Sequence, residues 1–229
     1  MRRAFTRVGC VAALLAAALF APCALAQEEF PPPQGKGRVV VMLSGASGSG
    51  GKYQTVAKAV AKLGYDVTLF DANKLNGKGS QALIAAIEKA RSMPHALPGK
   101  VGLIGFSMGG GIALGRGSQL PSYVAVDIVW YPTTGWLRDP PGFASRIEVP
   151  VLMFAGTMDD YMQCCLISRA RALADSAAAA KVPFELIDYP VMHDFMVEGT
   201  NYDPKAYADA FDRTAARLKV ALADSAEAR

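Results

Sequence analysis

The stretch VGLIGFSMGGG, residues 101–111, decides the fold, because an apolar run of strand length passes through Gly-x-Ser-x-Gly into a helix start. A nucleophile in this pattern sits on a very tight turn, where side chains at positions 105 and 109 would collide. The turn raises the Ser107 hydroxyl above the sheet edge and directs the Met108 N–H at a substrate oxygen. The following helix presents its N-terminal dipole to developing negative charge. The stretch therefore predicts Ser107 as a catalytic nucleophile.

Apolar segments of strand and helix length alternate on both sides of this stretch. Several of the strand segments are apolar nearly throughout, which favours a parallel sheet that is covered on both faces. The sequence predicts an α/β fold with a doubly wound, mostly parallel sheet of about six or more strands. The expected strands cover residues 38–44, 66–70, 100–105, 123–131, 149–155 and 184–189. The expected helices cover residues 52–63, 81–91 (with Ser80 as N-cap), 108–116, 166–179 and 204–222, the last burying Tyr207, Phe211, Ala215, Leu218 and Leu222.

The first 26 residues have the order of parts of a secretory signal peptide. A basic start precedes an alanine-rich apolar run, and Ala24-Leu25-Ala26 predicts cleavage after Ala26. We therefore expect a secreted or periplasmic protein without a stable membrane anchor. Residues 27–37 are expected to form an exposed N-terminal arm, and residues 38–229 a single domain. Loss of the leader lowers the formal net charge from +4 to +1, so no basic patch argues for nucleic acid.

A nucleophilic serine needs a base and an acid, and few residues can supply them. Only His95 and His193 are available as the base. His193 follows the nucleophile and the last strand, which is the order of this fold, whereas His95 precedes the nucleophile in a proline-bounded loop. The acid should follow the fifth strand, where Asp159 is favoured and Asp160 is the alternative.

The glycine-rich loop at residues 44–52 is expected to supply a second oxyanion donor. We expect Ala46, with Ser47 next, to act together with Met108. The loop does not fit a phosphate-binding P-loop, because Ala46 replaces its first glycine and Tyr53 its metal-binding hydroxyl. No cofactor and no metal are expected.

Two further features remain open at this stage. The adjacent Cys164 and Cys165 could be bridged in an oxidising compartment, although free thiols are favoured over a strained small ring. Aromatic residues near the expected site could bind substrate or simply pack, and these are Trp130, Tyr131, Trp136, Tyr161 and Phe195. Trp136, on the irregular stretch 132–148, and Tyr161 are retained as substrate-binding candidates.

Five segments resemble the α/β-hydrolase superfamily, and within it the small, capless dienelactone-hydrolase-like group. They read VVVMLSGASG, KLGYDVTLFDAN, GLIGFSMGG, VPVLMFAGTMDD and YPVMHDF. The resemblance implies no large cap domain, with Ser107, Asp159 and His193 as nucleophile, acid and base. The chain departs from the group in having serine where its namesakes carry cysteine. Ser44 also stands where many superfamily members have histidine.

These features together favour a serine hydrolase that cleaves small-molecule carboxylic esters or lactones through an acyl-enzyme on Ser107. The serine in place of cysteine widens the expected substrates from lactones to esters in general. The alternatives are a non-catalytic binding protein on the same scaffold, and a peptidase or acyltransferase that uses the same three residues. The sequence leaves the oligomeric state open.

Overall fold

The computed structural model describes residues 27–196 and 199–224, so the predicted signal peptide lies outside the described residues. The strands are β1 (Gln27–Phe30), β2 (Gly37–Leu43), β3 (Asp66–Phe70), β4 (Ala96–Phe106), β5 (Val124–Trp130), β6 (Val151–Gly156) and β7 (Phe184–Tyr189). The α-helices are α1 (Lys52–Ala61), α2 (Ser80–Arg91), α3 (Met108–Arg116), α4 (Pro140–Ala144), α5 (Ile167–Ala180) and α6 (Pro204–Asp224).

The strands form one sheet in the order β1-β3-β2-β4-β5-β6-β7. Every neighbouring pair is parallel except β1 with β3. The chain moves outward from β2 to β3 and then crosses back to β4 on the other side of β2. This reversal places a crevice between the carboxyl ends of β2 and β4, where open α/β sheets bind their ligands.

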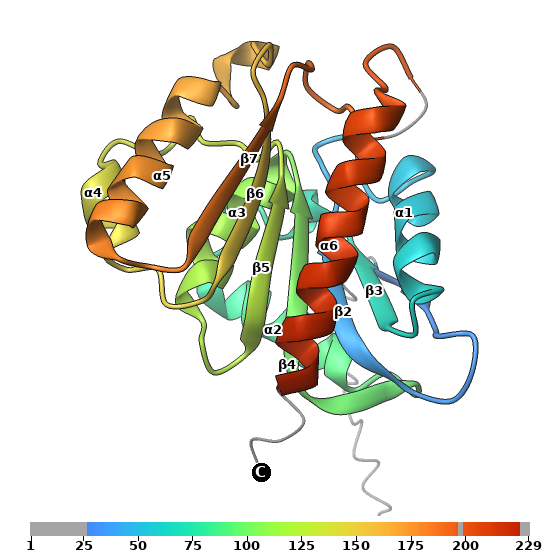
Figure 1. The fold of residues 1–229 in the computed structure, drawn as a ribbon. Coiled ribbons are helices and arrows are strands. Elements are labelled where there is room, and N and C mark those ends of the chain that lie inside the picture. The colour runs from blue at the N-terminus through green and yellow to red at the C-terminus, as the bar shows by residue number, and fades with distance from the viewer. Residues whose placement is uncertain (1–26, 197–198, 225–229) are drawn as a thin grey trace, which may run out of the picture.

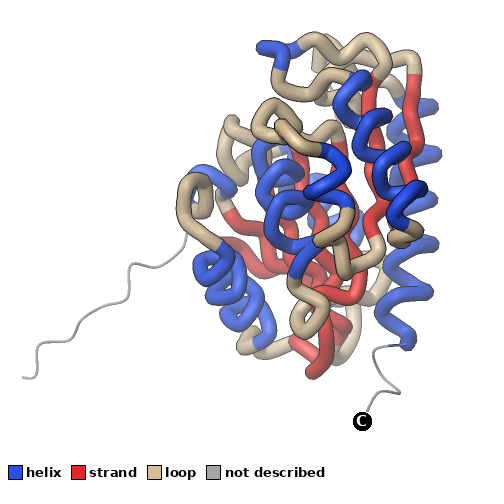
Figure 2. Tube along the Cα trace, turned by 90° about the vertical axis from the view of Figure 1, so that its left-hand side faces the viewer, coloured by secondary structure: helices blue, strands red, loops and turns tan. Residues whose placement is uncertain are grey.

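Helices cover both faces of the sheet, as Figures 1 and 2 show. Alternate residues of β2 divide between the two cores: Val39, Val41 and Leu43 face one, and Val40 and Met42 face the other. Helices α1 and α6 pack on the second face, and α2, α3, α4 and α5 on the first. The predicted doubly wound α/β fold without a large cap is confirmed.

Three local predictions were wrong. Residues 27–30 are not part of an exposed arm, because they pair antiparallel with β3 and bury Phe30. Ser80 is the first residue of α2 rather than its N-cap, which is Gly79. The buried stripe of α6 is centred on Ala206, Ala210, Thr214, Leu218 and Leu222, so three predicted members (Tyr207, Phe211 and Ala215) are only partly buried beside it.

The sheet brings the candidate site together at one edge. Ser107 follows β4, Asp159 follows β6, His193 follows β7 and Ala46 follows β2. Since these strands are parallel, their carboxyl ends share an edge and the four loops meet there. Within the described ranges, no helix combines the length and apolarity needed to cross a bilayer.

Candidate active site

Ser107 occupies a strained turn between β4 and α3, with φ 49°. Glycine is required at both flanking positions, for different reasons. A Cβ on Gly105 would lie 2.5 Å from the Gly109 carbonyl oxygen, and one on Gly109 would lie 2.3 Å from that of Ser44. The turn is held by the Ser107 N–H, which donates to the Trp130 carbonyl at 3.0 Å. The strain is thus fixed by neighbouring strands, as is common at functional sites.

A continuous hydrogen-bonded series runs from Asp159 through His193 to Ser107. The imidazole Nδ1 lies 2.7 Å from Asp159 Oδ2, and Nε2 lies 2.9 Å from Ser107 Oγ. Both residues of the acid–base pair are buried, at 3% and 7% exposure for Asp159 and His193. The other carboxylate oxygen of Asp159 accepts from the Tyr161 N–H at 3.1 Å, which fixes the carboxylate in place. Asp160 is exposed and precedes a short 3-10 turn.

Two tyrosine rings enclose the imidazole of His193. Tyr161 stacks on it at 4.8 Å with an interplanar angle of 8°, and Tyr131 meets it edge-on at the same distance. Asn201 donates through its side-chain amide to the His193 carbonyl at 2.9 Å. Because ring and backbone are both held, the imidazole is presented to Ser107 in one orientation.

The two expected oxyanion donors, the backbone N–H groups of Met108 and Ala46, belong to segments at this edge. Met108 begins α3, so its N–H has no intrahelical acceptor. Ala46 lies in the loop after β2 and lines the same pocket as Ser107. That loop is tied down by the Ser44 hydroxyl, which accepts from the Ala72 N–H at 3.1 Å. The Asn73 side-chain amide donates to the Ala46 carbonyl at 3.1 Å.

The pocket at Ser107 is small, at about 190 Å³. Sequence reasoning missed several of its lining residues, namely Lys52, Tyr53, Asp194 and Asn201. Lys52 forms an ion pair with Asp194, which also accepts from the Tyr131 hydroxyl at 3.1 Å. Burial raises the pKa of Tyr131 well above its usual range, so this hydroxyl keeps its proton and donates.

A sequence signal existed for only one of these residues. Asp194 directly follows the favoured base, which could have suggested a place at the site. Lys52, at the start of α1, contacts Asp194 across 142 positions of the sequence. Nothing in the sequence around Lys52 indicates this contact.

Several aromatic candidates lie outside this pocket. Trp130, Tyr131 and Phe195 are at most 1% exposed and pack in the core against one another. Trp136 packs edge-on against Phe143 and lines a separate groove beside α3 that includes Met108. Of the two substrate-binding candidates, only Tyr161 lines the pocket that contains Ser107.

His95 lies away from the catalytic edge. It precedes β4 at the opposite end of the strand from Ser107 and pairs with Glu29 of β1 at 3.0 Å. A larger hollow of about 670 Å³ also lies at the amino ends of β5 and β6, lined in part by Val124 and Pro150. None of the triad candidates reaches it.

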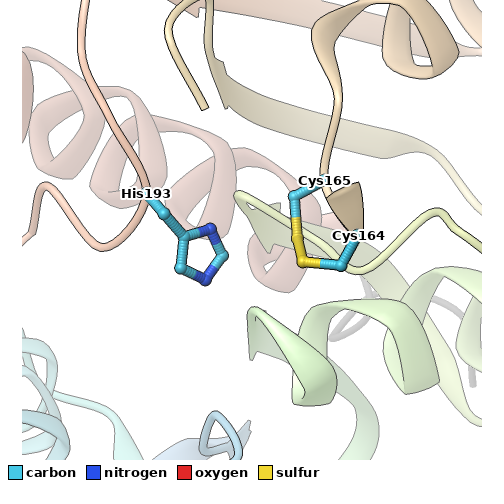
Figure 3. A group of neighbouring side chains, drawn as sticks. All are labelled: Cys164, Cys165 and His193. Carbon is cyan, nitrogen blue, oxygen red and sulfur yellow. A yellow bond between two sulfur atoms is a disulfide. The ribbon is translucent and has the colours of Figure 1, made fainter. Parts of the chain in front are cut away.

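Cys164 and Cys165 form a disulfide with each other, so the preference for free thiols was wrong. The bridge lies beside the imidazole of His193, as Figure 3 shows. The disulfide closes a small ring between two consecutive residues. In the bridged form they do not offer the thiolate ligands that a metal ion needs.

The fold is shared with several solved structures of low sequence identity. A protein from Klebsiella pneumoniae assigned as a dienelactone hydrolase has 16% identity and a TM-score of 0.73, over 84% of this chain and 92% of its own. The dienelactone hydrolase-like promiscuous phosphotriesterase P91 from metagenomic libraries has 20% identity and a TM-score of 0.68, over 84% and 91%. Esterase 2 of Thermogutta terrifontis, phosphorylated by paraoxon, has 17% identity and a TM-score of 0.64, over 82% and 85%.

A comparison of the sequence with curated proteins gives no match. The model of the dienelactone hydrolase family, in contrast, matches residues 67–222. That range covers more than half of the chain and contains Ser107, Asp159 and His193. The chain therefore belongs to the dienelactone hydrolase family.

Proposed function

We propose that this protein is a serine hydrolase that cleaves small carboxylic esters or lactones through an acyl-enzyme on Ser107. The observation that carries the proposal is the hydrogen-bonded series Asp159–His193–Ser107, which ends at a solvent-accessible pocket. Family membership supports the same class of chemistry. The esterase and phosphotriesterase activities named for two structural neighbours belong to those proteins, and they motivate ester probes here.

In the proposed reaction, Ser107 Oγ attacks the carbonyl carbon as its proton passes to His193 Nε2. Asp159 accepts the Nδ1–H, which orients the ring and stabilises the imidazolium. The N–H groups of Met108 and Ala46 hold the oxyanion, and loss of one such donor costs on the order of 3 kcal/mol in barrier height. The ester C–O bond then breaks, and His193 returns the proton to the leaving alcohol. Water attacks the acyl-enzyme by the same proton path and releases the acid.

The size of the pocket supports short substrates. Pockets for drug-sized ligands span roughly 300–1,000 Å³, well above the value of about 190 Å³ at Ser107. Acetyl or butyryl groups suit this volume, and long acyl chains do not. We infer a preference for compact esters and lactones.

The test is hydrolysis of p-nitrophenyl acetate and p-nitrophenyl dodecanoate by the wild type and by Ser107→Ala. Rapid turnover of the acetate and slow turnover of the dodecanoate are expected. In Ser107→Ala, acetate turnover should fall on the order of 10⁶-fold towards the rate without enzyme. Near-wild-type turnover by a folded Ser107→Ala variant would rule out the proposed nucleophile.

We also propose that the reaction takes place in the periplasm or outside the cell. The basis is the basic start, the apolar run and Ala24-Leu25-Ala26 in residues 1–26. Protein recovered from a bacterial periplasmic fraction should begin at Gln27 by N-terminal sequencing. An intact Met1 terminus on all of the protein would contradict this localisation.

A further inference from the structure

The bridge between Cys164 and Cys165 is poorly suited to stabilising the fold. A disulfide stabilises mainly by restricting the loop that it closes in the unfolded chain. The sequence separation here is 1, so the bridge encloses no intervening residue and joins no distant segments. A role for the bridge must therefore come from the residues that it contacts.

The two cysteines and His193 form a compact cluster of potential ligands. Their sulfur atoms and an imidazole nitrogen all lie within 4.8 Å of one another. Figure 3 shows the bridge beside the ring, on a segment that approaches from the turn before α5. Cys165 and His193 are buried, and the Thr134 N–H fixes the Cys164 carbonyl at 2.8 Å. The cluster is thus held in place by the surrounding chain.

We propose that the reduced pair, Cys164 and Cys165, together with His193 binds a thiophilic divalent ion, Zn²⁺ or Cd²⁺, and that the bound ion stops hydrolysis. Reduction by two equivalents of a thiol breaks the S–S bond, forms two Cys–SH groups and oxidises the thiol to its disulfide. Ion binding then releases the two thiol protons. The oxidised enzyme offers no thiolates, so the ion does not change its activity, and the reduced enzyme is active until the ion binds.

The donor set suits such an ion. Two thiolates and one imidazole are ligands that Zn²⁺ binds at about 2.3 and 2.0–2.1 Å, with a fourth position left for water. In a tetrahedral site with those bonds, neighbouring ligand atoms lie roughly 3.5–3.8 Å apart. The three ligand atoms already lie within 4.8 Å of one another, and breaking the S–S bond frees both sulfur atoms to move apart. Thiolates also favour soft ions over Mg²⁺ and Ca²⁺.

Inhibition follows from the bonds that His193 already makes. Its Nδ1 is engaged by Asp159 and its Nε2 by Ser107. An ion that takes either nitrogen breaks one link of the series. The imidazole then cannot accept the Ser107 proton in its present geometry. This last step rests on the proposed function, whereas ion binding itself does not.

The experiment uses the full chain, reduced with dithiothreitol, desalted without oxygen and titrated with Cd²⁺. The cadmium–thiolate charge-transfer band in the ultraviolet reports binding directly. The reduced chain should bind one ion at this site, and the oxidised chain should show no such band. The double variant Cys164→Ser/Cys165→Ser keeps Cys10 and Cys23, so its signal measures any Cd²⁺ binding by those two cysteines and is subtracted from that of the wild type. His193→Ala should weaken binding roughly tenfold or more, equivalent to about 1.4 kcal/mol.

Activity is measured in the same titration, with each protein compared with its own rate without metal. Hydrolysis by the reduced wild type should fall in step with the charge-transfer band and return when a chelator is added. The proposal is overturned by equal Cd²⁺ binding in the double variant, by undiminished affinity in His193→Ala, or by full activity at saturation. If no ester is hydrolysed even without Cd²⁺, the proposed function fails, while the absorbance titration still tests the site.

Discussion

The two histidines of the chain each contact a carboxylate, but the regions around them differ. His193 lies at the carboxyl edge of the sheet, is 7% exposed, and has Asp159 on one nitrogen and Ser107 on the other. His95 lies at the amino end of β4, and its side chain is 44% exposed beside Glu29. A carboxylate partner alone therefore does not make a histidine a catalytic base. The difference arises from burial and from a second partner that has a proton to give.

The largest expected effect comes from removing each histidine in turn. His193→Ala should lower kcat/KM for p-nitrophenyl acetate on the order of 10⁶-fold, because nothing then accepts the Ser107 proton. His95→Ala should change kcat/KM less than twofold, since its half-buried pair with Glu29 lies away from the pocket. The matched control is the thermal midpoint, which His95→Ala should also barely change. Similar losses in both variants would contradict the assignment of His193 alone as the catalytic base.

The acid can be tested with the adjacent pair Asp159 and Asp160. Asp159→Asn should lower kcat on the order of 10⁴-fold, because the amide favours the wrong imidazole tautomer. Asp160→Asn is the control, and its exposed side chain should leave kcat within a fewfold of the wild type. A larger loss in Asp160→Asn than in Asp159→Asn would reassign the acid.

Asp127 is a fully buried acid without the partners that Asp159 has. Neither of its carboxyl oxygens has a hydrogen-bond partner among the described residues, and burial raises its pKa well above the usual range. The folded state therefore holds this proton more tightly than the unfolded chain. The stability that the protonated form provides is lost as the pH rises above the unfolded pKa towards the folded one.

Asp127→Asn should remove that pH dependence. At pH 7 the variant should be more stable than the wild type, by on the order of 1 kcal/mol, and the difference should shrink towards pH 4. Urea unfolding at several pH values measures this. The stability of the variant minus that of the wild type should be larger at pH 7 than at pH 4. A smaller value at pH 7 would contradict the raised pKa of Asp127. Ester hydrolysis is expected to be unchanged.

The smallest effect is expected at the pocket rim. Tyr161 stacks on His193 and lines the pocket, whereas Trp136 lines the neighbouring groove. Tyr161→Ala should raise KM or lower kcat by about 2- to 10-fold, in line with the loss of one aromatic contact. Trp136→Ala should leave both constants within twofold for p-nitrophenyl acetate. A greater effect at Trp136 would place the acyl group in its groove instead.

The sequence predicted the parts of the molecule that depend on local pattern. The order of strands and helices and the turn at Ser107 follow from apolar periodicity and from the glycines at 105 and 109. The structure brings His193 and Asp159 to Ser107, as chain order suggested. It also shows why glycine is needed at position 109. A side chain there would collide with the Ser44 carbonyl and not with residue 105, a contact that only the folded sheet reveals.

The parts that were missed depend on contacts between distant segments. Strand β1 reads as an arm because three of its four residues are polar, and it is held by pairing with β3 and by burial of Phe30. The Lys52–Asp194 pair joins the start of α1 to the loop after β7. The preference for free thiols at Cys164 and Cys165 was wrong for a different reason, because adjacency alone permits either redox state.

The acyl-enzyme on Ser107 is tested most directly by a pre-steady-state burst with p-nitrophenyl acetate, combined with mass spectrometry of the quenched protein. A burst of about one p-nitrophenol per chain and one acetyl group, located on the peptide that contains Ser107, is expected. Ser107→Ala should show neither. An acetyl group on another residue, or full turnover without any Ser107 adduct in the quenched protein, would contradict the acyl-enzyme on Ser107.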